Sequence, residues 1–155
     1  MTHQTSSRLM GMVLKSDSSA RTRTATRRIV FALAAMGTVA LGLAVHFLVP
    51  GDAAGLVADA LYTVLVYLFV GFLAPRIPRV WVAAVALAFS AAVELSQLSG
   101  LPAQLAQSFP PSRLVLGTTF SALDLVAYAI GAVAALAVDT AISARAAAWG
   151  SSQAE

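Results

Sequence analysis

The chain has 155 residues, of which 59% are hydrophobic and only 11% are charged, and its formal net charge is +3. Soluble proteins have about 25% charged residues, and a water-soluble domain of this size could not bury so much apolar surface. The chain has no cysteine, which excludes disulfides, thiolate metal sites and cysteine nucleophiles. Six of the ten Lys and Arg residues precede Ile29, so the positive charge belongs to the amino-terminal tail and does not indicate a nucleic-acid partner.

The amino-terminal tail, residues 1–28, is rich in Ser, Thr and Arg and contains a single acid, Asp17. A segment this polar cannot bury enough apolar surface to fold, so it is predicted to be disordered. Lys and Arg are enriched on the cytoplasmic side of membrane proteins, which predicts a cytoplasmic amino terminus. Arg27-Arg28 weakly resembles a twin-arginine signal, but the apolar run that follows is longer than a signal-peptide core, and the first helix is expected to be retained.

Four apolar runs follow the tail, and each is long enough to cross a lipid bilayer as a helix. They cover residues 29–49, 56–74, 80–98 and 114–142. Because the loop 74–79 is short, the second and third spans are predicted to be antiparallel neighbours. That loop carries Arg76 and Arg79, whereas the loop 50–55 has no Lys or Arg, which fits four crossings with both termini in the cytoplasm.

The predicted fold class is all-α: a polytopic membrane protein with a four-transmembrane-helix bundle and a disordered basic N-terminal tail. The predicted units are the tail (1–28), the transmembrane domain (29–142) and a cytoplasmic C-terminal tail (143–155). Leu101, Leu105 and Phe109 recur every four residues, so a short interfacial helix is expected on the outer surface before Pro110. The last span begins with weak helix formers, and its regular helix is expected from near Phe120.

Acidic side chains inside the predicted spans need partners, because an ionised group at the bilayer centre costs roughly 2.5 to 3.5 kcal/mol. A rise of about 1.5 Å per residue puts Asp59, Glu94 and Asp124 in the outer half of the membrane or at its outer boundary. Arg113 is the only strongly basic residue near that level, which predicts an ion-paired cluster of Arg113, Asp124 and Glu94. Residues three or four positions apart share a helical face and add further polar groups. The candidate ligand-binding residues are Glu94, Gln97, Arg113, Asp124, Tyr128, Asp59 and Tyr62.

Polar groups in a membrane also hold helices together, at about 0.6 kcal/mol per contact. This structural interpretation is favoured for Asp59, which lies near the interface. Asp139, near the cytoplasmic end of the last span, is expected to be solvated. The sequence has no Gly-rich phosphate loop, no close set of His and acids and no nucleophile paired with a base, so it predicts no catalytic residue, metal site or cofactor and disfavours an enzyme.

A set of motifs in the chain resembles those of a small bacterial membrane family, domain of unknown function 2809. They are Glu94-x-x-Gln97, Arg113 and Asp124-x-x-x-Tyr128-x-x-Gly131, together with Asp59-x-x-Tyr62, Tyr67 and Leu116-Gly117. The likeness covers roughly residues 29–139. The pattern is also similar to VanZ-like proteins, which pair E-x-x-Q on one membrane helix with an Arg and D-x-x-x-N-x-x-G on the next, although Tyr128 stands here in place of the Asn. The resemblance implies a multi-pass protein of the bacterial inner membrane with a role in the cell envelope and no established reaction.

Three functions fit these observations. The first is an envelope protein whose outer-leaflet cluster binds a polar lipid head group or a lipid-linked wall precursor, with Arg113 contacting phosphate or carboxylate. The second is a small proton- or cation-coupled transporter, expected to be a homo-oligomer because four helices enclose little pathway. The third is a purely structural partner subunit. Membrane lipids are expected partners in each case.

Overall fold

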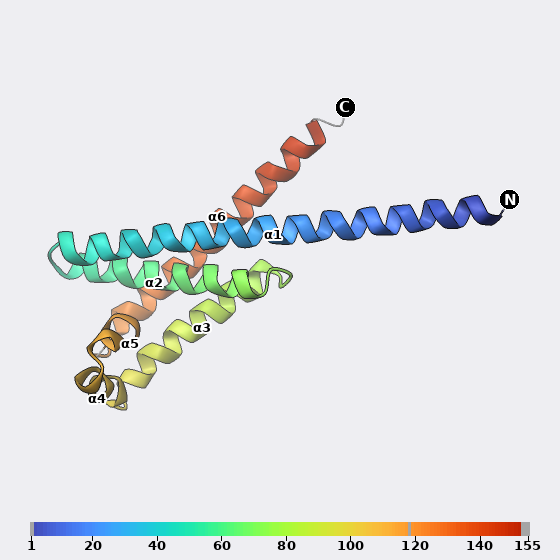
Figure 1. Ribbon diagram of the computed structural model, residues 1–155. Helices are drawn as coiled ribbons and strands as arrows, with labels where there is room; N and C mark the ends of the chain where they lie inside the picture. Colours follow the sequence, from blue (N-terminus) through green and yellow to red (C-terminus); the bar gives the residue numbers. More distant parts are fainter. Residues whose placement is uncertain (1, 118, 153–155) are drawn as a thin grey trace.

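The computed structural model describes residues 2–117 and 119–152, and within that range the chain is built from helices joined by short connections (Figure 1). In chain order the elements are α1 (Thr2–Leu48), α2 (Asp52–Leu73), α3 (Arg79–Gln97), α4 (Leu101–Ser108), the 3₁₀ turn η1 (Pro110–Ser112), α5 (Arg113–Leu116) and α6 (Ala122–Ser152).

Four of these helices are long and apolar enough to cross a membrane. Their candidate spans are Thr24–Leu48, Ala53–Leu73, Arg79–Gln97 and Ala122–Trp149. Large apolar side chains such as Leu33, Ile130 and Val133 are exposed on the outside of the bundle, where lipid rather than water would surround them. The structure therefore confirms the predicted class, an all-α polytopic membrane protein with four spans.

Helix α1 is 47 residues long and begins at Thr2, well before the first apolar run. The sequence predicts a disordered tail over residues 1–28, and this stays a prediction. The helix assigned to residues 2–28 is continuous with the first span. The segment has no proline before Pro50, so nothing in it interrupts the backbone ladder of a helix. The division of the chain into units 1–28, 29–142 and 143–155 stays a prediction, because α1 continues through residue 28 and α6 continues through residue 142.

Helix α2 lies at the centre of the bundle and packs against α1, α3 and α6, while α3 also packs against α6. The buried core between α2, α3 and α6 consists of Tyr67, Val82, Ala83, Ala86 and Ala135. Two glycines permit close packing. A Cβ at Gly131 would overlap the Ala60 carbonyl oxygen, and one at Gly71 would overlap the Phe31 ring. Small residues at such contacts are the usual means of helix association in lipid.

The bundle has two distinct ends. Figure 1 shows the α2–α3 turn, the start of α1 and the end of α6 on one side, and the α1–α2 loop with α4 and α5 on the other. The short helix α4 occupies the place predicted for an interfacial helix, and Pro110 follows it. We refer to the two sides as the arginine end, which holds Arg27, Arg76 and Arg79, and the glutamate end, toward which Glu94 lies.

Candidate functional site

Glu94 is the most deeply buried charged residue of the described chain, with no exposed surface at all. It shares one face of α3 with Ser90, which is also fully buried and accepts a hydrogen bond from the Thr63 hydroxyl of α2 at 3.0 Å. The four-residue spacing therefore directs both polar side chains into the bundle.

Three neutral donors surround the Glu94 carboxylate. The Ser121 backbone N–H donates to Oε1 at 2.5 Å, and the Tyr128 hydroxyl donates to Oε2 at 3.0 Å. Gln97 Nε2 donates to the same Oε2 at 3.2 Å. These bonds satisfy a buried carboxylate without any cationic side chain, which lowers the cost of burying it.

Gln97 holds this arrangement to the loop that precedes α6. Its Nε2 also donates to the Leu116 carbonyl at 2.8 Å, while its Oε1 is buried and has no hydrogen-bond partner in the described part of the chain. Gly117 makes room for the amide, because a Cβ there would lie 2.6 Å from Gln97 Nε2. The φ of Gly117 is 62° with ψ −169°, a conformation that is essentially restricted to glycine.

Two further carboxylates, Asp59 and Asp124, lie within electrostatic range of the Tyr128 hydroxyl that donates to Glu94. Asp59 on α2 and Asp124 on α6 are half-buried, and Asp59 interacts with both Asp124 and Glu94 through its charge. The Tyr62 and Tyr128 rings, which come from the same two helices, have centroids 6.2 Å apart. We call the set Asp59, Tyr62, Glu94, Gln97, Asp124 and Tyr128 the glutamate site.

Arg113 does not join the glutamate site as an ion-pair partner. It is exposed at the start of α5, and the ion pairs formed among the described side chains do not include it. The predicted cluster of Arg113, Asp124 and Glu94 is therefore wrong in this respect. The Ser121 N–H, Tyr128 and Gln97 occupy the hydrogen-bonding positions around Glu94 that the sequence analysis assigned to a guanidinium.

A second polar centre, which the sequence patterns did not predict, lies at the arginine end around Asp139. Oδ2 of Asp139 accepts the Tyr67 hydroxyl at 2.9 Å and Arg27 Nη2 at 3.1 Å, and Arg79 Nε lies 3.3 Å away. The Arg79 contact is an ion pair without hydrogen-bond geometry, because Arg79 Nε has no hydrogen-bond partner in the described range. We call Arg27, Tyr67, Arg79 and Asp139 the Asp139 cluster. It joins α1, α2, α3 and α6.

Asp139 is thus not a solvated side chain, as the sequence analysis expected, because only 11% of the side chain is exposed. The sequence contains a pattern that could have predicted the Asp139 cluster. Asp139 is the only acid near the level where Arg27 and Arg79 flank two other spans. Unlike charges at one depth of a bilayer pair with each other.

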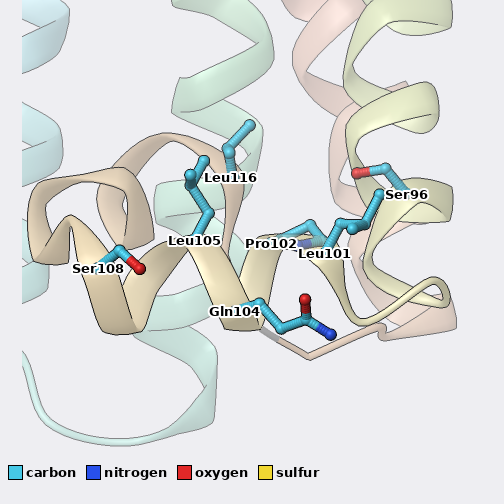
Figure 2. Close-up of a pocket in the computed structure, with 7 residues that line it drawn as sticks. All are labelled: Ser96, Leu101, Pro102, Gln104, Leu105, Ser108 and Leu116. Carbon is cyan, nitrogen blue, oxygen red and sulfur yellow. The ribbon is translucent and has the colours of Figure 1, made fainter.

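A groove of about 480 Å³ opens beside the glutamate site, between the end of α3, α4 and α5. Figure 2 shows Leu105 and Leu116 close together, with Ser96 on α3 facing them. Leu116, which lines the groove, is also the residue whose carbonyl accepts from Gln97. One residue therefore connects the groove with the buried glutamate site.

Residues that could ligate a divalent metal are not grouped in the part of the chain that the structure describes. No three His, Cys, Asp or Glu side chains lie together with metal-binding spacing there.

Comparison with known proteins gives one match. Residues 48–132, more than half of the chain, match the family model described as protein of unknown function (DUF2809). The matched range contains every residue of the glutamate site but neither Arg27 nor Asp139, and it is narrower than the range expected from the sequence motifs. No curated protein and no solved structure matches the chain. The similarity to VanZ-like proteins is not shown by these comparisons.

Proposed function

The chain belongs to the DUF2809 family of proteins of unknown function, and we propose that it is a membrane protein whose glutamate site binds a proton or a monovalent cation and couples it to transport. The observation that carries this proposal is the charge of the site. Asp59 lies within electrostatic range of both Glu94 and Asp124, and no described arginine or lysine forms an ion pair with any of these three carboxylates.

The site also has more hydrogen-bond acceptors than donors, which likewise favours binding of a proton or a cation. Gln97 Oε1 is a buried acceptor with no partner among the described residues, and the half-buried Asp59 and Asp124 add carboxylate oxygens. Buried acceptors without donors are costly, and a proton or a cation would satisfy them. Ionisable groups inside membrane spans commonly mark such pathways.

The proposed orientation puts the arginine end in the cytoplasm and the glutamate site toward the outer leaflet of a bacterial inner membrane. Arg27, Arg28, Arg76 and Arg79 lie at one end of the bundle, and short loops rich in Lys and Arg stay on the cytoplasmic side. A bundle of four helices leaves little room for a transport pathway inside it, so the protein is expected to function as a homo-oligomer.

The experiment is a flux measurement in reconstituted vesicles that contain a pH-sensitive dye. With a pH gradient imposed and Na⁺ or K⁺ on the opposite side, the wild-type protein is expected to dissipate the gradient. Glu94→Gln is expected to reduce the rate at least tenfold, because the amide cannot carry the charge. Asp52→Asn, just outside the second span, is the matched control and is expected to keep the wild-type rate.

Two further variants address the case in which Glu94→Gln loses flux only because it misfolds. Asp59→Asn and Asp124→Asn remove charge from half-buried side chains that form no hydrogen bond with another described residue, so both variants are expected to fold and to slow the flux. Circular dichroism of each purified variant reports its helix content. A wild-type protein that leaves the gradient as stable as in protein-free vesicles would refute the transport proposal.

A second candidate is favoured by the groove beside the site. A lipid head group or a lipid-linked wall precursor could lie in it, with an amine directed at the carboxylates and a phosphate at Arg113, which begins the helix that contributes Leu116. Gene deletion is expected under this proposal to alter lipid composition or tolerance of wall-directed antibiotics. Unchanged phenotypes in both assays would contradict it.

A further inference from the structure

We propose that a groove at the arginine end, between α1 and the α2–α3 turn, binds the phosphate of an anionic phospholipid. The groove has a volume of about 370 Å³, and its polar lining includes Arg28 and Arg76. It lies at the opposite end of the bundle from the glutamate site, so the proposal does not depend on the function of that site.

The arginine end carries more positive charge than its acid can neutralise. Arg27, Arg28, Arg76 and Arg79 lie at this level, and Asp139 is the one acid that pairs with them in the described chain. The Asp139 cluster uses Arg27 and Arg79. Arg28 and Arg76 are exposed, and no described acid neutralises their charge. The Arg28 guanidinium lies 5.9 Å from the centroid of the Phe72 ring, a contact that does not neutralise its charge.

The shape of the groove favours a phospholipid over a free anion. Leu73 and Ile77 line it next to the arginines, with exposed fractions of 57% and 39%. The spans Thr24–Leu48 and Ala53–Leu73 begin and end here, at the level where head groups meet acyl chains. Guanidinium groups bind phosphate through paired hydrogen bonds, and the apolar lining would contact the acyl chain.

The Asp139 cluster holds the wall of this groove in place. Arg27 donates from Nη1 to the Pro75 carbonyl at 2.6 Å and from Nη2 to Asp139, which fixes the α2–α3 turn against α1. Its guanidinium also lies over the Phe31 ring, 4.9 Å from the centroid. A preformed wall reduces the entropy lost when a ligand binds.

Native mass spectrometry of the full-length protein tests the proposal. The detergent-solubilised protein is equilibrated with equal amounts of phosphatidylglycerol and phosphatidylcholine, and the ratio of retained lipids is measured. The wild-type protein is expected to retain phosphatidylglycerol preferentially. Arg28→Gln and Arg76→Gln are each expected to lower the ratio about fivefold, since one arginine near a lipid surface contributes about that factor.

Three controls separate a specific site from general surface charge. Arg145→Gln removes an exposed arginine of α6 that does not line the groove, and it is expected to leave the ratio unchanged. The double variant Arg28→Lys with Arg76→Lys keeps the charge but loses paired hydrogen bonding, and it is expected to bind more weakly than the wild type. Thermal unfolding followed by circular dichroism verifies the fold of every variant.

Two results would overturn the proposal. One is an equal loss of preference in Arg145→Gln and in the groove variants, which would indicate nonspecific charge. The other is complete displacement of phosphatidylglycerol by millimolar inorganic phosphate, which would indicate a site for the free ion rather than for a lipid. Retention of the lipid against phosphate supports the proposal.

Discussion

At the scale of single residues, neutral hydrogen-bond donors lower the free-energy cost of burying the Glu94 carboxylate. Glu94 has no exposed surface, yet three hydrogen bonds reach its two oxygens. Two of these donors come from the chain before and within α6, so the carboxylate also joins α3 to α6.

Tyr128→Phe tests the structural part of this role. The substitution removes one donor to Glu94 and is expected to lower the free energy of unfolding by about 1 to 2 kcal/mol, between the mean for hydrogen bonds in membranes and that for bonds to charged groups. The measurement is reversible unfolding in mixed micelles. Tyr62→Phe is the matched control, because no hydrogen bond of the Tyr62 hydroxyl is found in the described structure, and an equal loss in both variants would contradict the assigned role.

Gly117→Ala tests the loop that positions Gln97. Alanine would have to adopt a φ of 62° with its Cβ 2.6 Å from Gln97 Nε2, so a loss of about 1 to 3 kcal/mol in the free energy of unfolding is expected. Gly55→Ala lies in open space within α2 and is expected to stabilise by about 0.5 to 1 kcal/mol. A neutral effect at Gly117 would exclude this conformation.

The residues of the glutamate site were predictable from spacing, but their partners were not. The three-residue and four-residue intervals placed Glu94 with Gln97 and Tyr128 with Asp124 on shared faces. The prediction for Arg113 was wrong because depth in the membrane does not tell which way a side chain points. Arg113 begins a separate short helix, α5, and its side chain is exposed. The Ser121 contact is made by a backbone N–H, which no side-chain pattern reveals.

At the scale of helices, the lengths of the apolar runs predicted four spans. The first three agree with the structure to within about five residues at each end, whereas the last one starts and ends later than predicted. The run 114–142 appeared as one span, but Arg113–Leu116 forms a separate turn and α6 begins at Ala122. The expectation of regular helix from near Phe120 was close, because Gly117 interrupts the chain there. Hydropathy alone does not detect such a break.

Gly131→Ala tests the contact between α2 and α6. The new Cβ would overlap the Ala60 carbonyl oxygen, which is backbone and cannot rotate away, so the helices must separate. A loss of about 1 to 3 kcal/mol is expected in the same unfolding assay. Gly42→Ala, where nothing lies within 4 Å, is expected to cause no loss, and equal effects would refute the close contact.

Asp139→Asn tests the Asp139 cluster. It removes the charge that pairs with Arg27 and Arg79, whose side chains are 25% and 38% exposed. Because these arginines are partly solvated, the expected loss is about 1 to 3 kcal/mol rather than the larger cost of breaking a dry ion pair. Arg145→Gln changes the charge of α6 outside the cluster and is expected to leave stability unchanged.

At the scale of the whole molecule, the distribution of charge predicts the orientation in the membrane. The chain has no cysteine, so single cysteines can be introduced at Ser99 and Ser151, both exposed. A membrane-impermeant maleimide is expected to label Ser99→Cys in intact cells and Ser151→Cys only after permeabilisation, because arginine-rich ends remain inside. The unsubstituted chain gives the background, and the reverse pattern would invert the topology.

The order in which the helices are made gives α6 a particular role. Arg27 leaves the ribosome more than a hundred residues before Asp139, and Glu94 precedes both Ser121 and Tyr128. Until the last span is made, Arg27 therefore lacks Asp139, and Glu94 lacks Ser121 and Tyr128. Because α6 supplies Asp139 to one polar centre and Tyr128 to the other, both centres are expected to form only after the last span has been made.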